Sequence, residues 1–198
     1  MQHLKDIEVL KTPALIEAFL RIDRRDFVLP EYQDQAYEDY PLPISSGQTI
    51  SQPYTVAFML ELLQPKKGEK ILDIGSGSAW TTALLAEIVG NKGKVIGTEL
   101  KPSLVRLGQE NLLKYAFPWA EIHQAKKDSL GLFKEAPFDK ILVSAAATEV
   151  PKELLDQLKN RGTMVLPVAD TVLCVKRVLG KEPEVQRFEG FVFVPLLS

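Results

Sequence analysis

The chain has 198 residues, of which 45% are hydrophobic and 25% charged, and its 24 basic and 26 acidic residues give a formal net charge of −2. These values are typical of a globular protein, and the length suits one α/β domain and is too short for two full ones. The slightly acidic balance, without a basic stripe in the sequence, argues against nucleic acid as a partner.

Cysteine and histidine usage excludes two further classes of site. The one cysteine, Cys174, rules out an internal disulfide bond and fits a reducing compartment. It lies in an apolar run, which favours a buried strand thiol over a nucleophile. Because His3 and His123 add no ligand spacing typical of zinc, we predict no metal site.

The N-terminus and the apolar runs of the sequence predict the compartment. The first residues carry charges where a signal peptide needs an apolar core. No apolar run approaches the length of a membrane span. We therefore expect a cytoplasmic protein with no membrane partner.

The N-terminal part, residues 1–65, predicts helices and one long irregular segment. Thr12 and Pro13 have the residue types of a helix start, and the apolar residues after them fall on one face of a helix. Arg24, Arg25 and Asp26 follow in a stretch of mixed charge. We interpret these three as surface or salt-bridge residues.

Residues 36–53 form the irregular segment, which is rich in hydroxyl and amide groups and has little periodicity. Segments of this length are either flexible or functional. Four apolar residues predict that this one packs onto the core: Tyr40, Leu42, Ile44 and Ile50. Such packing would hold Gln48, Thr49 and Ser51 in fixed positions.

A helix follows this segment, with Pro53 in its first turn and with Ser51 or Gln52 as its cap. Serine is among the preferred cap residues, so one interpretation of Ser51 is a helix cap and nothing more. The other interpretation is a functional hydroxyl. The residues alone leave both open.

Residues 71–80, Ile-Leu-Asp-Ile-Gly-Ser-Gly-Ser-Ala-Trp, predict the centre of the site. An apolar run, small residues and a renewed apolar run predict a buried strand, a tight turn and a helix. Gly75 and Gly77 would adopt torsions closed to residues with a Cβ and let the backbone approach a ligand, which the free N–H groups of the helix start would face. Asp73 falls at the carboxyl end of the strand, where ligands bind in open α/β sheets.

The type of turn discriminates between cofactors. A dinucleotide fingerprint needs a third glycine, and Trp80 stands in its place. The turn suits S-adenosylmethionine better, because no pyrophosphate has to lie on the helix start. Glu99 ends a second apolar strand, residues 94–98, where an acidic side chain could bind the two hydroxyls of a ribose. The alternative is that the glycines only shape a turn and that Glu99 is a solvated strand end.

The rest of the chain predicts an α/β fold. We expect helices at 102–115 and 150–158, and strands at 120–124, 138–144, 163–168, 172–178 and 187–196. This alternation predicts a mostly parallel sheet with right-handed crossovers, covered on both faces. The last two strands should pair antiparallel through residues 180–183. Asp128 and Ser129 follow the strand at 120–124, where a polar side chain could meet an adenine edge.

Five segments together resemble the protein-L-isoaspartate O-methyltransferase family. The most specific is Gly47-Gln48-Thr49-Ile50-Ser51-Gln52-Pro53, because the glycine turn at 73–78 is shared by many methyltransferases. The others are 39–44, 136–139 and 193–196, and the match runs in the family's order from about Phe27 to Leu196. The resemblance implies a Rossmann-like methyltransferase, a three-layer sandwich with extra N-terminal helices. One domain would span 1–198, with the helices and a cover loop in 1–65 and the core in 66–198.

The resemblance implies methyl transfer from S-adenosylmethionine, with S-adenosylhomocysteine as product, to the α-carboxylate of L-isoaspartyl residues in damaged proteins. The ester would collapse to a succinimide that hydrolyses partly to normal aspartate. Ser51 would be the active-site serine, with Gln48, Thr49 and Ile50 beside the substrate. The residues implied on the cofactor side are Asp73, Gly75, Ser76, Gly77, Ser78, Glu99, Leu100, Asp128 and Ser129. We expect a monomer whose partners are isoaspartyl proteins and peptides.

The chemistry agrees with these residue types. An isoaspartyl carboxylate is ionised at neutral pH, since carboxyl pKa values lie near about 4, and it needs no strong base to attack a sulfonium methyl. Proximity and alignment can supply much of the rate enhancement. Hydroxyl and backbone N–H groups would hold the carboxylate in line.

The sequence departs from the family pattern at four places. Ala79, Arg161 and Ala169 stand where the family has glycine, and Lys126-Lys127-Asp128 stands for Gly-Asp-Gly. A methyl group at Ala79 could crowd the cofactor. These changes keep two alternatives open: a binding module of the same fold without catalysis, and a methyltransferase for another peptide carboxylate.

Overall fold

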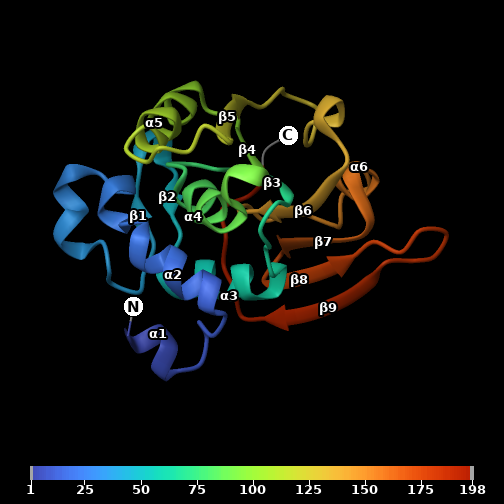
Figure 1. The fold of residues 1–198 in the computed structure, drawn as a ribbon, viewed down its shortest axis with the longest axis horizontal. Coiled ribbons are helices and arrows are strands. Elements are labelled where there is room, and N and C mark those ends of the chain that lie inside the picture. Colours follow the sequence, from blue (N-terminus) through green and yellow to red (C-terminus); the bar gives the residue numbers. More distant parts are fainter. Residues whose placement is uncertain (1, 197–198) are drawn as a thin grey trace.

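In the computed structural model, which describes residues 2–196, the centre of the molecule is a seven-stranded sheet in the order β5-β4-β3-β6-β7-β8-β9 (Figure 1). Its strands are β3 (Lys70–Ile74), β4 (Lys94–Glu99), β5 (Ala120–Gln124), β6 (Phe138–Val143), β7 (Leu158–Val168), β8 (Thr171–Lys176) and β9 (Glu184–Glu189). The pairs from β5 to β7 are parallel, whereas β7 with β8 and β8 with β9 are antiparallel. The predicted mostly parallel sheet and its antiparallel C-terminal pair are confirmed.

Helices lie on both sides of this sheet. The α-helices of residues 2–196 are α1 (Gln2–Asp6), α2 (Pro13–Arg21), α3 (Pro53–Leu63), α4 (Trp80–Val89), α5 (Pro102–Leu112) and α6 (Lys152–Gln157). The 3-10 helices are η1 (Arg24–Phe27), η2 (Pro30–Gln35), η3 (Ser45–Gly47), η4 (Gly90–Lys92) and η5 (Phe133–Glu135). Helices α3, α4 and α5 pack on one face, with α2 against α4, and α6 packs on the other. Among residues 2–196, every helix is too short or too polar to cross a membrane.

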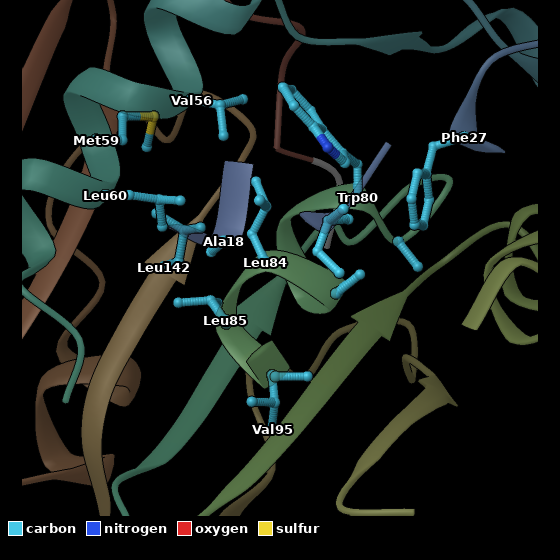
Figure 2. Packing of buried hydrophobic residues seen from close by; sticks show 14 of the residues in the cluster. Ala18, Phe27, Val56, Met59, Leu60, Trp80, Leu84, Leu85, Val95 and Leu142 are labelled. Atoms are coloured by element: carbon cyan, nitrogen blue, oxygen red, sulfur yellow. The ribbon is translucent and has the colours of Figure 1, made fainter. Parts of the chain in front are cut away.

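Alternate residues of the central strands face two separate apolar clusters, as a sheet buried on both sides requires. Ile71 of β3 and Leu142 of β6 belong to the cluster under α3 and α4, whereas Leu72 belongs to the cluster under α6. Figure 2 shows Leu60 of α3 and Leu84 of α4 pointing into the same layer as Leu142. Each fully buried leucine stabilises the fold by about 1.5–3 kcal/mol. The sheet is therefore the buried frame that carries the site.

The irregular segment before α3 contains a two-stranded antiparallel hairpin, β1 (Leu42–Pro43) with β2 (Thr49–Ile50). Leu42, Ile44 and Ile50 are buried, as predicted. Tyr40 is 43% exposed, so its predicted burial is wrong, and its phenol hydroxyl forms a hydrogen bond at the surface. We call residues 36–52 the cover segment.

The C-terminal end differs from the prediction of one strand over 187–196. Strand β9 ends at Glu189, because Gly190 adopts φ 94° and the chain leaves the sheet. Residues 191–196 continue towards the carboxyl end of β6, where Pro195 forms an isolated parallel bridge with Ala146. This C-terminal segment thereby reaches the edge of the sheet at which ligands bind in α/β folds.

Two further boundaries differ from the sequence predictions. Strand β7 begins at Leu158, five residues before the predicted start, and pairs with β6 from Phe138 onward across a register shift. Helix α5 ends at Leu112, before the predicted end at 115. The predicted strands at 120–124 and around 71–74 and 94–98 are confirmed as β5, β3 and β4.

Candidate active site

A pocket that is partly open to solvent lies at the carboxyl ends of β3, β4 and β6. The chain passes from β3 to β4 on one side and returns to β6 on the other. This is the switch point at which open α/β sheets bind ligands. We call it the main pocket, and its lining includes Gln48, Thr49, Gly75, Gly77, Glu99, Leu100, Lys101, Lys126, Ser129, Ser144 and Val194.

The glycine turn joins β3 to α4 at one wall of the main pocket. Gly75 and Gly77 have φ values of 72° and 53°, so the predicted torsions are confirmed. The N–H groups of Gly75 and Ser76 donate to the carbonyl of Thr98 at 2.9 and 3.1 Å. The neighbouring strand β4 therefore takes these two N–H groups of the turn. The helix start, whose N–H groups we expected to face a ligand, begins later, at Trp80, and that expectation stays a prediction.

Glu99 ends β4 and is only 8% exposed. One carboxylate oxygen accepts from the N–H of Gly77 at 3.1 Å, and the other accepts from the N–H of Lys101 at 2.9 Å. These two bonds fix the carboxylate at the lining of the main pocket, beside Leu100. A carboxylate has about four acceptor sites, so capacity remains for ribose hydroxyls.

Asp73 is fully buried behind the glycine turn and lies outside the lining of the main pocket. Its Oδ2 accepts from the hydroxyls of Thr81 and Thr82, both at 2.7 Å, and its Oδ1 has no partner within residues 2–196. Burial raises the pKa of Asp73 to about 6, although the two threonine hydrogen bonds act in the opposite direction. Asp73 thus fixes the first turn of α4 and leaves one acceptor atom unpaired.

A second, smaller cavity joins the cover segment to the glycine turn. Ile50 and Ser51 line one side, and residues 75–78 with Trp80 line the other. Two buried donors of these residues, Ser76 Oγ and Trp80 Nε1, have no hydrogen-bond partner within residues 2–196. Buried donors normally have partners, so both atoms suit an anionic ligand group. The amino-acid carboxylate of S-adenosylmethionine is such a group, and the residues present fit it.

The cover segment brings hydroxyl and amide groups to these spaces. Gln48 and Thr49 line the main pocket, and Thr49 also lines the smaller cavity with Ser51. Ser51 borders in addition a third hollow, which extends outward past Thr55. The cap position of α3 is Gln52, and no side chain caps this helix. The interpretation of Ser51 as a helix cap alone is therefore wrong.

Of the two residues predicted at the adenine end, Asp128 and Ser129, only one lines the main pocket. Ser129 lines the main pocket, whereas Asp128 is exposed and lies outside the lining. Lys101 and Lys126 line the pocket in this region. The adenine contact of Asp128 remains a prediction from the sequence alone.

Each departure from the family's glycine pattern coincides with a left-handed backbone. The φ values of Ala79, Asp128, Arg161 and Ala169 are 74°, 63°, 63° and 53°. The fold therefore keeps the conformation that glycine would adopt more easily. Ala79 is fully buried, and its Cβ lies 3.3 Å from the place where a Cβ of Gly108 in α5 would stand. Its methyl group packs against α5, so the expectation that it crowds a cofactor is wrong.

Sequence reasoning missed two residues of the site. Ser144, the residue after β6, lines the main pocket, the smaller cavity and the third hollow. A polar residue at the carboxyl end of a strand beside the switch point is a signal that could have found it. Arg24 is fully buried and is not the surface residue that its charged neighbours predicted. Nothing in the local sequence distinguishes it from the exposed Arg25.

Cys174 lies partly buried in β8, and burial raises the pKa of its thiol. Its sulfur lies 3.8 Å from the carbonyl oxygen of Leu62 in α3. These contacts fit the predicted strand thiol. In the part of the chain that the structure describes, no three His, Cys, Asp or Glu side chains gather as metal ligands.

Comparisons with known proteins bear on this site. The family model for protein-L-isoaspartate(D-aspartate) O-methyltransferase matches residues 1–198. The chain is 39% identical to the protein-L-isoaspartate O-methyltransferase of Methanopyrus kandleri, over 100% of this chain and 89% of that one. It is 40% identical to the Aeropyrum pernix protein of the same name, over 100% of this chain and 78% of that one.

A solved structure agrees with these relatives. A Plasmodium falciparum protein, assigned as a protein-L-isoaspartate O-methyltransferase and crystallised with S-adenosyl-L-homocysteine, is similar with a TM-score of 0.85 and 25% identity. The match covers 98% of this chain and 95% of that one. The resemblance found from the segments of the sequence is thereby confirmed. The chain belongs to the protein-L-isoaspartate(D-aspartate) O-methyltransferase family, whose members are S-adenosylmethionine-dependent methyltransferases.

Proposed function

We propose that the protein transfers a methyl group from S-adenosyl-L-methionine to the α-carboxylate of L-isoaspartyl residues in damaged proteins and peptides. One observation carries the proposal: Thr49 and Ser144 line the main pocket, the smaller cavity and the third hollow at once. Three hollows, each partly open to solvent, therefore meet at a pair of hydroxyl groups. Methyl transfer needs this arrangement, because donor and acceptor must reach each other from separate sites.

The main pocket and the smaller cavity together would hold the cofactor. In this proposal Glu99 and Leu100 bind the ribose, and Ser129 lies at the adenine end. The glycine turn residues Gly75, Ser76, Gly77 and Ser78 border the methionine end, with Asp73 behind them. Bound S-adenosyl-L-methionine supplies a methyl group on a positively charged sulfonium sulfur.

The third hollow would hold the acceptor. Its walls come from the cover segment, the start of α3 and the C-terminal segment, and they include Ser51, Thr55 and Phe193. In this proposal Ser51 is the catalytic hydroxyl that donates to the acceptor carboxylate, and Gln48, Thr49 and Ile50 border the substrate. The carboxylate is already ionised at neutral pH, so the residues orient it and exclude water, and no protein base is required.

A labelling experiment tests the proposal. Purified protein is incubated with methyl-labelled S-adenosyl-L-methionine and an isoaspartyl peptide, beside the same peptide with normal aspartate. We expect base-labile label on the isoaspartyl peptide only. Label on neither peptide, together with clear binding of S-adenosyl-L-homocysteine in calorimetry, would favour the non-catalytic binding module. Label on a different peptide carboxylate would favour the other alternative.

Three expectations from the sequence belong to the same proposal. They are a monomeric protein without a nucleic-acid partner, a cytoplasmic location, and one domain with a cover part in 1–65 and a core in 66–198. Size-exclusion chromatography with light scattering tests the first. A mass of two chains would contradict it.

A further inference from the structure

Arg24 lies in η1, and its guanidinium is buried between the cover segment and the glycine turn. Its Nη1 donates to the carbonyl of Ala36, and its Nη2 donates to the carbonyl of Ser51 at 2.9 Å. A longer contact of 3.5 Å joins Nη2 to the carbonyl of Tyr40. One side chain thus holds the beginning, the middle and the end of the cover segment.

The same guanidinium also touches the opposite side of the smaller cavity. Its central carbon lies 5.3 Å from the ring centre of Trp80, the first residue of α4. This is the distance of a cation–π contact. Trp80 follows the glycine turn, so Arg24 bridges the wall that would bind the cofactor and the segment that carries Ser51.

The partners of Arg24 are unusual for a buried charge. Within residues 2–196 its hydrogen-bond acceptors are main-chain carbonyl groups, and its buried Nε has no acceptor. Burial lowers the pKa of Arg24 to about 10, although the charge of Asp39 acts in the opposite direction. A buried cation held in this way is weak evidence for stability, since apolar replacements of buried charges are often tolerated.

Ser51 depends on this contact because little else fixes it. The hairpin ladder ends at Ile50, and α3 begins at Pro53. Ser51 therefore lies between two regular elements, and its carbonyl accepts from Arg24. A shift of about 1 Å in a positioned group can cost a large factor in rate.

We propose that Arg24 is the positioning residue of the active site, which sets the Ser51 hydroxyl against the acceptor by holding the Ser51 backbone. The inference rests on the proposed function for its kinetic consequence. Its structural consequence, a fixed cover segment, does not depend on activity. Lysine keeps the charge but cannot replace the fork of donors that reaches two carbonyl groups.

The test is a double-mutant cycle with R24K, S51A and the variant that carries both changes. We expect R24K to lower kcat at least tenfold while the Kd for S-adenosyl-L-homocysteine changes less than twofold. The double variant should be no more than about twofold slower than the slower single variant, because Arg24 acts through Ser51. Losses that multiply, or a Kd that rises in step with the fall in kcat, would overturn the proposal.

The matched control is R25K. Arg25 is the next residue of η1, and it pairs with Asp23 at the surface at 2.6 Å. We expect its kcat and Kd to stay within twofold of the unmodified protein. A loss as large as that of R24K would mean that any change in η1 disturbs the site.

Amide hydrogen exchange gives a readout without turnover. In R24K the amides of 36–52 should exchange faster, while those of 70–79 keep their rate. Unchanged exchange over 36–52 would overturn the proposal whether or not the protein methylates isoaspartyl peptides. Failure of both R24K and R24Q to fold, seen by circular dichroism, would also overturn it, because Arg24 would then serve the whole fold.

Discussion

The two sides of the smaller cavity are built in opposite ways. We call residues 75–78 the sheet wall. Main-chain hydrogen bonds from Gly75 and Ser76 to Thr98, and a bond from the N–H of Gly77 to the Glu99 carboxylate, hold it to the end of β4. The cover segment has a ladder of only two residue pairs and depends on a distant side chain, Arg24, and on buried apolar residues. Local sequence therefore specifies the first side, and long-range contacts specify the second.

This difference assigns separate tasks to the two sides. A wall fixed by the backbone is suited to bind a cofactor that is the same molecule in every reaction. A segment held by side chains can be altered without damage to the sheet, and in the proposed function it borders the acceptor. Changes in the sheet wall should therefore affect binding of the cofactor, whereas changes in the cover segment should affect turnover.

The largest effect should come from Gly75→Val in the sheet wall. Gly75 has φ 72° and lines both the main pocket and the smaller cavity, so a branched side chain would be strained and would enter the ligand space. We expect the affinity for S-adenosyl-L-homocysteine to fall at least about 1,000-fold, which is about 4 kcal/mol. Isothermal titration calorimetry measures it.

Gly90→Val is the matched control for this change. Gly90 has φ 64°, with open space where a Cβ would stand, and it lies at the far end of α4. Gly90 combines φ 64° with ψ −175°, a region confined essentially to glycine, so the backbone strain should cost about 1–3 kcal/mol of stability without loss of affinity. Equal losses of affinity in both variants would mean that general destabilisation explains the result.

The next effect concerns Asp73 and pH. Burial raises the pKa of Asp73 from 3.8 to about 6, so between these values the folded chain holds a proton that the unfolded chain has released. The contribution of this group to stability is therefore present below about pH 4 and is lost as the pH rises through 6. The side-chain amide of the Asp73→Asn variant cannot titrate. The stability of Asp73→Asn relative to the unmodified protein should rise by about 2 kcal/mol between pH 4 and pH 7.

Urea unfolding of both proteins across this pH range measures the effect. The comparison between the two proteins cancels the other titrating groups. A difference that stays flat with pH would show that the buried carboxyl carries no raised pKa. The affinity of Asp73→Asn for S-adenosyl-L-homocysteine would then test separately whether the sheet wall needs this carboxyl.

Ser51→Ala in the cover segment should have an effect of about 1.5–3 kcal/mol, the value of a hydrogen bond to a charged group. We expect kcat with an isoaspartyl peptide to fall about 10–150-fold, while the affinity for S-adenosyl-L-homocysteine stays within twofold. The control is Ser46→Ala, whose hydroxyl contacts Ser103 at 2.6 Å and lies outside the three spaces. A loss of affinity without a loss of kcat would place Ser51 on the cofactor side and contradict the division of tasks.

The smallest effect concerns the left-handed residues. Ala169 is exposed, so Ala169→Gly should relieve about 1–2 kcal/mol of strain and lose about 0.4–1 kcal/mol through the more flexible unfolded chain. We expect a net gain of about 0.5 kcal/mol. Ala79→Gly also removes a fully buried methyl group, worth about 0.8 kcal/mol, and should give no gain. Urea midpoints measure both, and a clear gain at Ala79 would contradict the packing of its methyl group against α5.

The sequence predicted the sheet wall better than the cover segment for a physical reason. The run from Ile71 to Gly77 contains its own apolar strand and its own turn residues, so its conformation can be predicted without the rest of the chain. This run did not reveal the acceptor of the turn's N–H groups, because that acceptor, the carbonyl of Thr98, lies on another strand. Strand pairing was needed to see that these donors are taken.

The cover segment could be recognised only by its resemblance to a family. Its apolar residues indicated burial, which is correct for Leu42 and Ile44 and wrong for Tyr40. Arg24 could not be identified, because a buried arginine and a surface arginine have the same sequence signature in a short mixed-charge stretch. Its contacts with Ser51 and Trp80 exist only in the folded chain.

Trp80 has a practical consequence for following this protein in solution. Its indole is 4% exposed, with Phe19 edge-on at 5.6 Å and the Arg24 cation above it, and it borders the smaller cavity. The indole N–H of the second tryptophan, Trp119, donates a hydrogen bond to the carbonyl of Ala86. Fluorescence emission from Trp80 should therefore change when a ligand binds in the smaller cavity or when the Arg24 guanidinium moves. Intrinsic fluorescence can then follow either change without an added label.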